Sequence, residues 1–199
     1  GLTSLKLFRA EAIARAERQS IECAIERGRE FANEIIPLHS TFTNGLSGHK
    51  VPAFLNHPDE VKFASPEAEA EQLASALEWI KKVPREVYRD GVMLANRLEC
   101  WSMYFTKPLA ASEAVMEPCS PSFCTMVLHL YPILINSRGK ETSGDFPNLV
   151  HLFQSWFGKL QDEKNQRQAT DLLAQANRLQ LNGPWPKLPR PVGTDLDEV

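Results

Sequence analysis

Three histidines in one segment are the residues best suited to bind a metal ion. His39, His49 and His57 are followed closely by Asp59 and Glu60. Imidazole nitrogens and carboxylate oxygens are common zinc ligands. None of the histidine pairs has the short spacing, about two to five residues, that is typical of zinc sites. The sequence therefore gives the hypothesis of a metal site at these three histidines, with ordinary surface loop histidines as the alternative.

Four other side chains could line a ligand pocket between helices. They are Trp101, Tyr104, His129 and Trp156. An apolar cavity with a few polar groups is a common binding site between helices. Aromatic residues at helical spacing also form ordinary protein cores. The ligand-pocket hypothesis therefore stands beside a plain core interpretation.

The sequence contains none of the catalytic signatures that we sought. It has no Glu-x-x-His for a di-iron site, no His-Glu-x-x-His and no Gly-x-Gly-x-x-Gly. A row of glutamates on one predicted helix indicates a solvated or partner-facing acidic surface; it comprises Glu22, Glu26, Glu30 and Glu34. We therefore assign no catalytic residue and predict no cofactor.

Charge and hydropathy disfavour two classes of partner. The 199 residues carry a formal net charge of -3 with a pI of about 6.0, so nucleic acid is not an expected partner. A small basic cluster is interpreted as a solvated helix junction that could touch phosphate; it comprises Lys81, Lys82, Arg85 and Arg89. The longest apolar run, residues 123–135, is shorter than the roughly 20 residues that cross a bilayer. No transmembrane segment is predicted.

The cysteine content indicates a reducing environment. Four cysteines are too sparse for a disulfide scaffold, and no Asn-x-Ser/Thr glycosylation acceptor occurs. We expect an intracellular compartment, either the cytoplasm or an organelle matrix reached after removal of a targeting peptide.

The C-terminal residues 184–199 are predicted to be an extended, proline-rich tail. Pro186 and Pro189 lie beside Arg190, and the chain ends at Val199. A polyproline segment makes no internal hydrogen bonds and commonly lies along another protein surface. A terminal carboxylate can also be captured by a groove in a partner. These four residues are therefore predicted to contact a partner protein.

Residues 4–36 are predicted to form one long helix, ended by Pro37. Apolar residues at spacings of three and four place a single stripe along it, namely Leu7, Ala10, Ala14, Ile21, Ala24, Phe31 and Ile35. Such a helix is longer than a small domain is wide, so part of it should pack against something else. Residues 37–64 are predicted to be irregular, with a small hairpin over 41–51 around Asn44-Gly45.

Further helices are predicted over residues 65–82, 84–105, 108–116, 122–136, 145–160 and 169–179. The first should bury Leu73, Leu77 and Ile80, and the second carries the clearest apolar stripe, namely Val87, Gly91, Leu94, Leu98, Trp101 and Phe105. Gly91 on that stripe indicates close approach of a neighbouring helix. A buried strand is the competing interpretation for residues 123–131.

The predicted fold is an all-α, multi-helix bundle. Residues 1–183 are predicted to form a single helical domain, and residues 184–199 form the tail. The N-terminal helix either packs within the domain or projects from it. The long helix and the tail favour a soluble, non-enzymatic subunit or adaptor that binds other protein subunits within a larger assembly. The alternative is a helical enzyme, or a ligand- or metal-binding sensor, with an aromatic-lined pocket.

Overall fold

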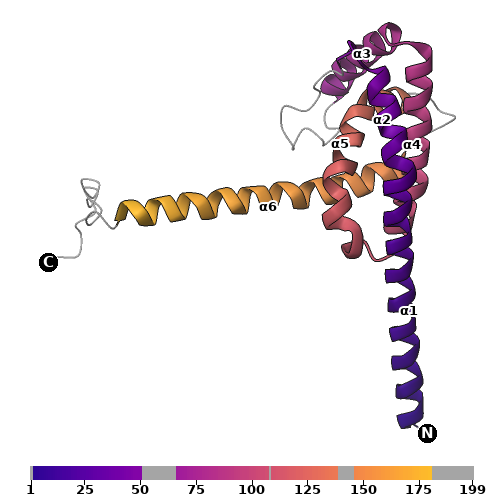
Figure 1. Cartoon of the computed structure of the whole chain (residues 1–199), viewed down its shortest axis with the longest axis vertical. Coiled ribbons are helices and arrows are strands. Elements are labelled where there is room, and N and C mark those ends of the chain that lie inside the picture. Colours follow the sequence, from indigo (N-terminus) through magenta and orange to yellow (C-terminus); the bar gives the residue numbers. More distant parts are fainter. Residues whose placement is uncertain (1, 51–65, 108, 139–145, 181–199) are drawn as a thin grey trace. The chain divides into compact units, whose positions relative to one another are not determined.

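The computed structural model describes residues 2–50, 66–107, 109–138 and 146–180 (Figure 1). Within these ranges the secondary structure is helical, and no β-strand occurs. The chain divides into two compact units, Gly1–Gln161 and Asp162–Val199. The predicted all-α class is thus confirmed for the described residues, and the first unit is a helical bundle. The predicted tail and the predicted domain boundary before it lie outside the described ranges.

The N-terminal helical segment continues past Pro37. It consists of α1 (Leu2–Glu30), the π-helical turn η1 (Phe31–Ile35) and α2 (Ile36–Gly45). The Ile36 N–H donates to the Phe31 carbonyl, five residues back, which makes this turn wider than an α-turn. Because the regular four-residue bonding is already interrupted there, the missing N–H of Pro37 breaks no further bond. The predicted helix end was wrong for this reason.

The predicted hairpin was also wrong, and so was the predicted irregular segment over residues 37–45, whereas residues 46–50 are irregular as expected. Residues 41–45 belong to α2, whose Phe42 side chain is completely buried. Asn44-Gly45 ends the helix, and the following Leu46 N–H donates to Phe42 and Thr43 carbonyls at 3.1 Å. An Asn-Gly pair serves as a helix stop as readily as a hairpin turn. Residues 51–64 lie outside the described ranges.

The next two helices confirm the predictions for residues 65–82 and 84–105. They are α3 (Pro66–Lys82) and α4 (Arg85–Thr106). The predicted α4 stripe is buried except for Phe105, which is half-buried. In α3 the prediction that Leu77 is buried was wrong, because Ala76 and Trp79 face the core and leave Leu77 39% exposed. Figure 1 shows α2 beside α4, and α3 packs on α5.

Helix α5 (Glu113–Arg138) is continuous across Pro118, Pro121 and Pro132. Residues 122–136 are helical as predicted, which excludes the competing strand interpretation of residues 123–131. The predicted separation of this helix from another over 108–116 was wrong, because one helix runs from Glu113 onward. Phe123, for example, is completely buried, as are Leu130 and Ile133 at later turns. Burial of apolar side chains around the helix holds the backbone helical even where prolines remove hydrogen bonds.

By length and composition, α5 is also a candidate membrane span. Residues 113–137 reach a mean hydropathy of 1.3, and 67% of the apolar stretch is buried inside the structure. The central helix of a soluble bundle has the same composition as a membrane span. One such helix is weak evidence for a membrane, and its burial against other helices gives it a role in the core.

Helix α6 (Pro147–Gln180) joins the two helices predicted over 145–160 and 169–179. Its first turns belong to the bundle, where Leu149, Phe153 and Trp156 are buried. From Asp162 the helix belongs to the second unit, in which the described side chains are exposed. No proline or glycine interrupts residues 159–180, which explains why the helix continues.

Gly91 provides a test of the helix packing. A Cβ atom there would lie 2.8 Å from Phe42 Cε2 and closer still to Ile133 Cδ1, which confirms the predicted close approach. Gly158 is a matched control, since a Cβ there meets nothing within 4 Å. Both Gly→Ala changes gain the same helix propensity, so Gly91→Ala should be less stable than Gly158→Ala by about 1–3 kcal/mol. Urea unfolding of both variants measures this difference, and equal stability would contradict the packing.

Candidate functional site

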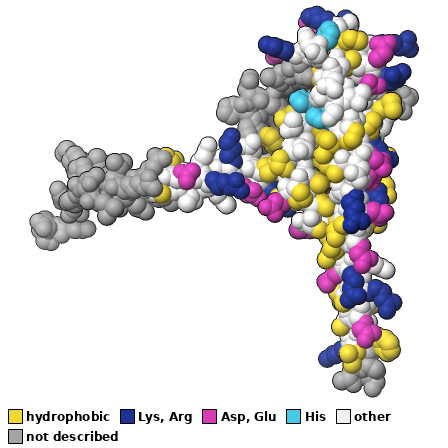
Figure 2. Space-filling model, in the orientation of Figure 1, with side chains coloured by type: hydrophobic (Ala, Val, Ile, Leu, Met, Phe, Trp, Pro, Cys, Tyr) yellow, Lys and Arg dark blue, Asp and Glu magenta, His cyan; other side chains and the backbone are white. Residues whose placement is uncertain are grey.

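The first half of α1 is exposed along its whole described length. All side chains from residue 6 to residue 19 are exposed, including Leu7 at 63%, Phe8 at 72% and Ile13 at 53%. Figure 2 shows hydrophobic side chains lying between charged ones along this part of the helix. At about 100° per residue these three side chains point to different sides of the helix, so they do not by themselves form one apolar patch.

The second half of α1 is held by the bundle. The Ser20 carbonyl accepts a hydrogen bond from the Ala111 N–H at 3.1 Å. About two helical turns further along α1, the Arg27 carbonyl accepts a hydrogen bond from the Trp101 indole N–H at 2.9 Å. The Arg27 guanidinium also lies 4.7 Å above the Tyr104 ring. These contacts fix α1 from about Ser20 onward.

An arginine of α4 accounts for part of the predicted acidic row. Arg97 forms ion pairs with Glu30, at 2.9 Å, and with Glu34. Glu30 also pairs with Arg27 of its own helix. Glu22 and Glu26 are exposed on the same helix. The row therefore divides into Glu30 and Glu34, which pair with Arg97 of α4, and Glu22 and Glu26, which have no contact with α4 among the described ion pairs.

The predicted apolar stripe of α1 divides in a similar way. Ala24, Phe31 and Ile35 are buried in the core, whereas Leu7 and Ile21 are exposed. A neighbouring line of exposed apolar residues runs beside the buried one at helical spacing. We name it the α1 stripe, and it comprises Leu7, Ala14, Ile21, Ile25 and Ala32. Ile21 and Ile25 are 46% and 47% exposed. The sequence alone did not separate this stripe from the core-facing one.

Two histidines predicted for different sites are brought together. His39 of α2 and His129 of α5 form a side-chain hydrogen bond, with 3.0 Å between Nε2 and Nδ1. Their ring planes differ by only 13°. His49 follows α2, where its backbone N–H bonds to Leu46, and His57 lies outside the described residues. In the described part of the chain, no group of three or more His, Cys, Asp or Glu side chains could hold a metal.

Burial lowers the pKa of both paired histidines. Removal from water disfavours the imidazolium form of each ring. For His39 the nearby charge of His129 lowers the pKa further. The pair therefore stays neutral below the ordinary histidine pKa of 6.5, and one N–H is available to link the two helices.

This pair predicts a pH-dependent stability. Below about pH 6.5 the unfolded chain binds protons that the folded histidines do not, so the free energy of unfolding falls. The loss starts near pH 6.5 and ends below the lowered pKa values, and the contribution is complete above pH 6.5. Urea unfolding between pH 7.5 and 5 should show a smaller loss for His129→Gln than for the wild type. The exposed His151→Gln is the control, and an identical loss in all three proteins would contradict the prediction.

The predicted ligand pocket includes two tryptophans that lie in a packed aromatic cluster. Trp101 and Trp156 are each 1% exposed, and their ring centroids are 5.8 Å apart. The rings of Phe31, Phe105 and Phe123 pack on Trp101 at 4.9, 4.7 and 5.6 Å. Such distances are those of close aromatic packing in a core.

The other two residues of the predicted pocket have different neighbours. Tyr104 lies under the Arg27 guanidinium, and His129 bonds to His39. The structure thus brings the two tryptophans together, whereas Tyr104 contacts Arg27 and His129 contacts His39. Binding of a ligand by these residues stays a prediction.

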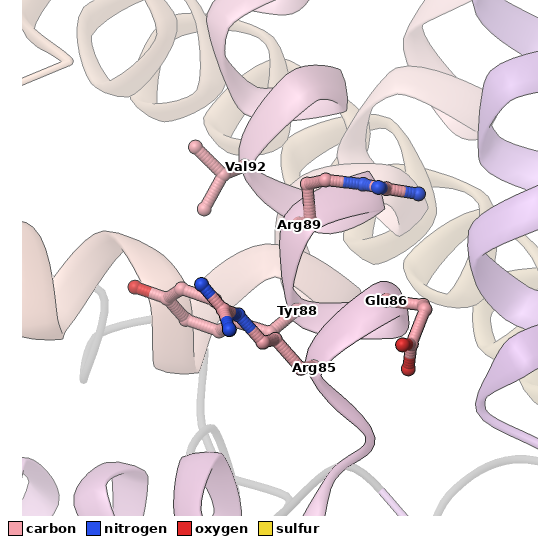
Figure 3. Close-up of a pocket in the computed structure, with 5 residues that line it drawn as sticks. All are labelled: Arg85, Glu86, Tyr88, Arg89 and Val92. Atoms are coloured by element: carbon pink, nitrogen blue, oxygen red, sulfur yellow. The ribbon is translucent and has the colours of Figure 1, made fainter.

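An open pocket of about 500 Å³ lies at the start of α4 (Figure 3). It is lined by Arg85, Glu86, Tyr88, Arg89 and Val92. The hydroxyl of Tyr88 accepts a hydrogen bond from the buried Asn136 side chain at 3.3 Å. Of the predicted basic cluster, Arg85 and Arg89 line the pocket, but Glu86 lines it too. This mixed lining gives no specific preference for an anion.

Comparison with known proteins leaves the chain without relatives from which a function could be transferred. No protein family, curated protein or solved structure matches it.

The predicted partner-binding residues of the tail lie outside the described residues, namely Pro186, Pro189, Arg190 and Val199. Any assignment of function therefore depends on the described surfaces and contacts.

Proposed function

We propose that the protein is a non-enzymatic helical subunit that binds another polypeptide of its assembly through α1. The observation that carries this proposal is the exposure of Leu7, Ile21 and Ile25 on one stripe of α1, a helix that is built into the core only from Ser20 onward. Burying each large aliphatic side chain contributes about 1.5–3 kcal/mol to association. A partner that covers the α1 stripe would supply that burial.

The chemistry of the cysteines is in keeping with a non-enzymatic role. Burial raises the pKa of the Cys119 thiol, and it raises the pKa of Cys124 to about 12. A thiol held protonated is a poor nucleophile and a poor metal ligand. All four cysteines are unpaired, which fits the proposed reducing, intracellular compartment.

The tail is a second contact region in this proposal. Its prolines are suited to a protein groove, as expected from the sequence. Nucleic acid is not a proposed partner, since the net charge is -3.

The test of the proposal is native mass spectrometry of the full chain isolated from its source. The wild type should carry other polypeptides or further copies beyond its own 22.4 kDa in a fixed stoichiometry. The double variant Leu7→Ser/Ile21→Ser should lose at least about tenfold in affinity, because two buried contacts of the partner disappear. Leu172→Ser is the control, since Leu172 is equally exposed, at 64%, but lies on α6.

Two outcomes would contradict the proposal. One is a wild-type chain that is isolated as a bare monomer under gentle conditions. The other is an α1 double variant that retains every bound polypeptide. Circular dichroism of the variant would establish that its helices are intact.

A second candidate function is a metal-binding sensor, and the pairing of His39 with His129 is the observation that favours it. The two imidazole nitrogens lie 3.0 Å apart on different helices and could supply two of the four ligands of a closed zinc site, but no third ligand among the described residues completes it, so the remaining ligands would have to come from elsewhere. Calorimetric titration with zinc should show binding to the wild type and none to His129→Gln if this function is correct. If titration of the wild type with zinc releases or absorbs no heat of binding, the metal-sensor function is ruled out.

A further inference from the structure

The two halves of α1 carry opposite charge. Residues 6–19 contain four basic and two acidic side chains, whereas residues 20–34, which include the first residues of η1, contain four acidic and two basic ones. Of these acidic residues, Glu30 and Glu34 already pair with Arg97, so Glu22 and Glu26 are the ones exposed for a partner. The α1 stripe runs through both halves. A partner that covers the whole stripe therefore needs an acidic half beside the first segment and a basic half beside the second.

A second copy of α1 in the antiparallel direction has this charge pattern. We infer that the α1 stripe binds the α1 stripe of a second copy of this chain, antiparallel, with the basic half of each helix on the acidic half of the other. This inference rests on the proposed function, whose partner it names. The arrangement is a closed two-fold dimer in which the same surface of both copies is used.

The stripe residues fit such a pairing at one register. If the two-fold axis passes between residues 19 and 20, Ala14 faces Ile25 of the second copy, and Leu7 faces Ala32. These two kinds of layer combine a large side chain with a small one, which allows close approach of the helices. Arg18 faces Ile21 of the second copy, so its guanidinium reaches toward the adjacent Glu22.

The charged residues needed for this contact are available. Arg15, Arg18 and Glu22 are exposed, and among the described ion pairs none involves them. In the register above, Arg15 and Arg18 of one copy flank Glu22 of the other. A parallel, in-register pair would instead place Arg18 against Arg18 and Glu22 against Glu22. Charge therefore selects the antiparallel direction, while the apolar layers supply most of the affinity.

Sedimentation equilibrium of the purified full chain tests the inference. The wild type should be a dimer of 22.4 kDa chains at micromolar concentration. Arg18→Glu and Glu22→Arg should each raise the dissociation constant about tenfold or more, because two-fold symmetry turns two attractive contacts into repulsive ones. Arg9→Glu is the matched control, since Arg9 lies on the opposite side of the helix and the charge change is the same.

Mixing the two variants separates contacts between chains from effects within one helix. Arg18 and Glu22 are four residues apart, so each single change also removes an attraction within α1. An equimolar mixture of Arg18→Glu and Glu22→Arg should form a heterodimer that is tighter than either variant alone, because the introduced glutamate of one chain then meets the introduced arginine of the other, although Arg15 beside that arginine keeps it weaker than the wild type. An intrahelical effect gives no such recovery, so failure of the mixture to dimerise would overturn the inference.

Cysteine cross-linking tests the direction. In a background with Cys23 and Cys100 changed to serine, a mixture of Leu7→Cys and Ala32→Cys should form disulfide-linked dimers. Leu7→Cys alone should not, whereas a parallel dimer would cross-link it. Cross-linking of Leu7→Cys alone would therefore overturn the antiparallel arrangement.

A monomeric wild type at 100 µM would overturn the second-copy inference. The proposed function would survive that result if a different polypeptide, bound in fixed stoichiometry, is lost from Leu7→Ser/Ile21→Ser. If the double variant keeps both its self-association and its bound polypeptides, the second-copy inference and the proposed function are both overturned.

Discussion

The Trp101 indole is the contact on which the bundle depends. Its ring packs on Phe31 of η1, Phe123 of α5 and Trp156 of α6, and its N–H reaches the Arg27 carbonyl of α1. One side chain of α4 thus touches four other elements, and it is only 1% exposed. A large aromatic ring contributes more buried area than any other side chain, and its single donor is satisfied without water.

This central ring also determines which part of α1 belongs to the bundle. The helix is bound from Ser20 to Ile35, where Trp101, Arg97 and the Ala111 N–H hold it. Before Ser20 no described side chain is buried. The division between a fixed half and a free half is therefore a property of the neighbours of α1. The helix α1 passes through both and continues into the π-helical turn η1 at residues 31–35.

The spacing of apolar residues along the sequence predicted those features of the fold that depend only on spacing within one helix. The stripe of α4 and the helical class follow from spacing within one helix, and both predictions were confirmed. The continuity of α5 across Pro118 and Pro132 was not predictable, because tertiary burial compensates there for missing hydrogen bonds. Nor was the pairing of His39 with His129, which lie 90 residues apart, because no spacing rule links such positions. Division of the α1 residues into buried and exposed lines likewise depends on the packing partner.

The anchored half of α1 has a consequence for how the free half becomes ordered. An isolated helix of about 12–15 residues is marginal in water, because its first turn must be nucleated at an entropic cost. Residues 6–19 avoid that cost, since the turns from Ser20 onward are already formed and the helix only needs to extend. Its free end should fray from the N-terminus, with backbone amides that exchange with solvent rapidly when uncovered and slowly when bound. The core thus acts as a template that keeps residues 6–19 nearly helical, so the contact proposed for them would cost little ordering of the backbone.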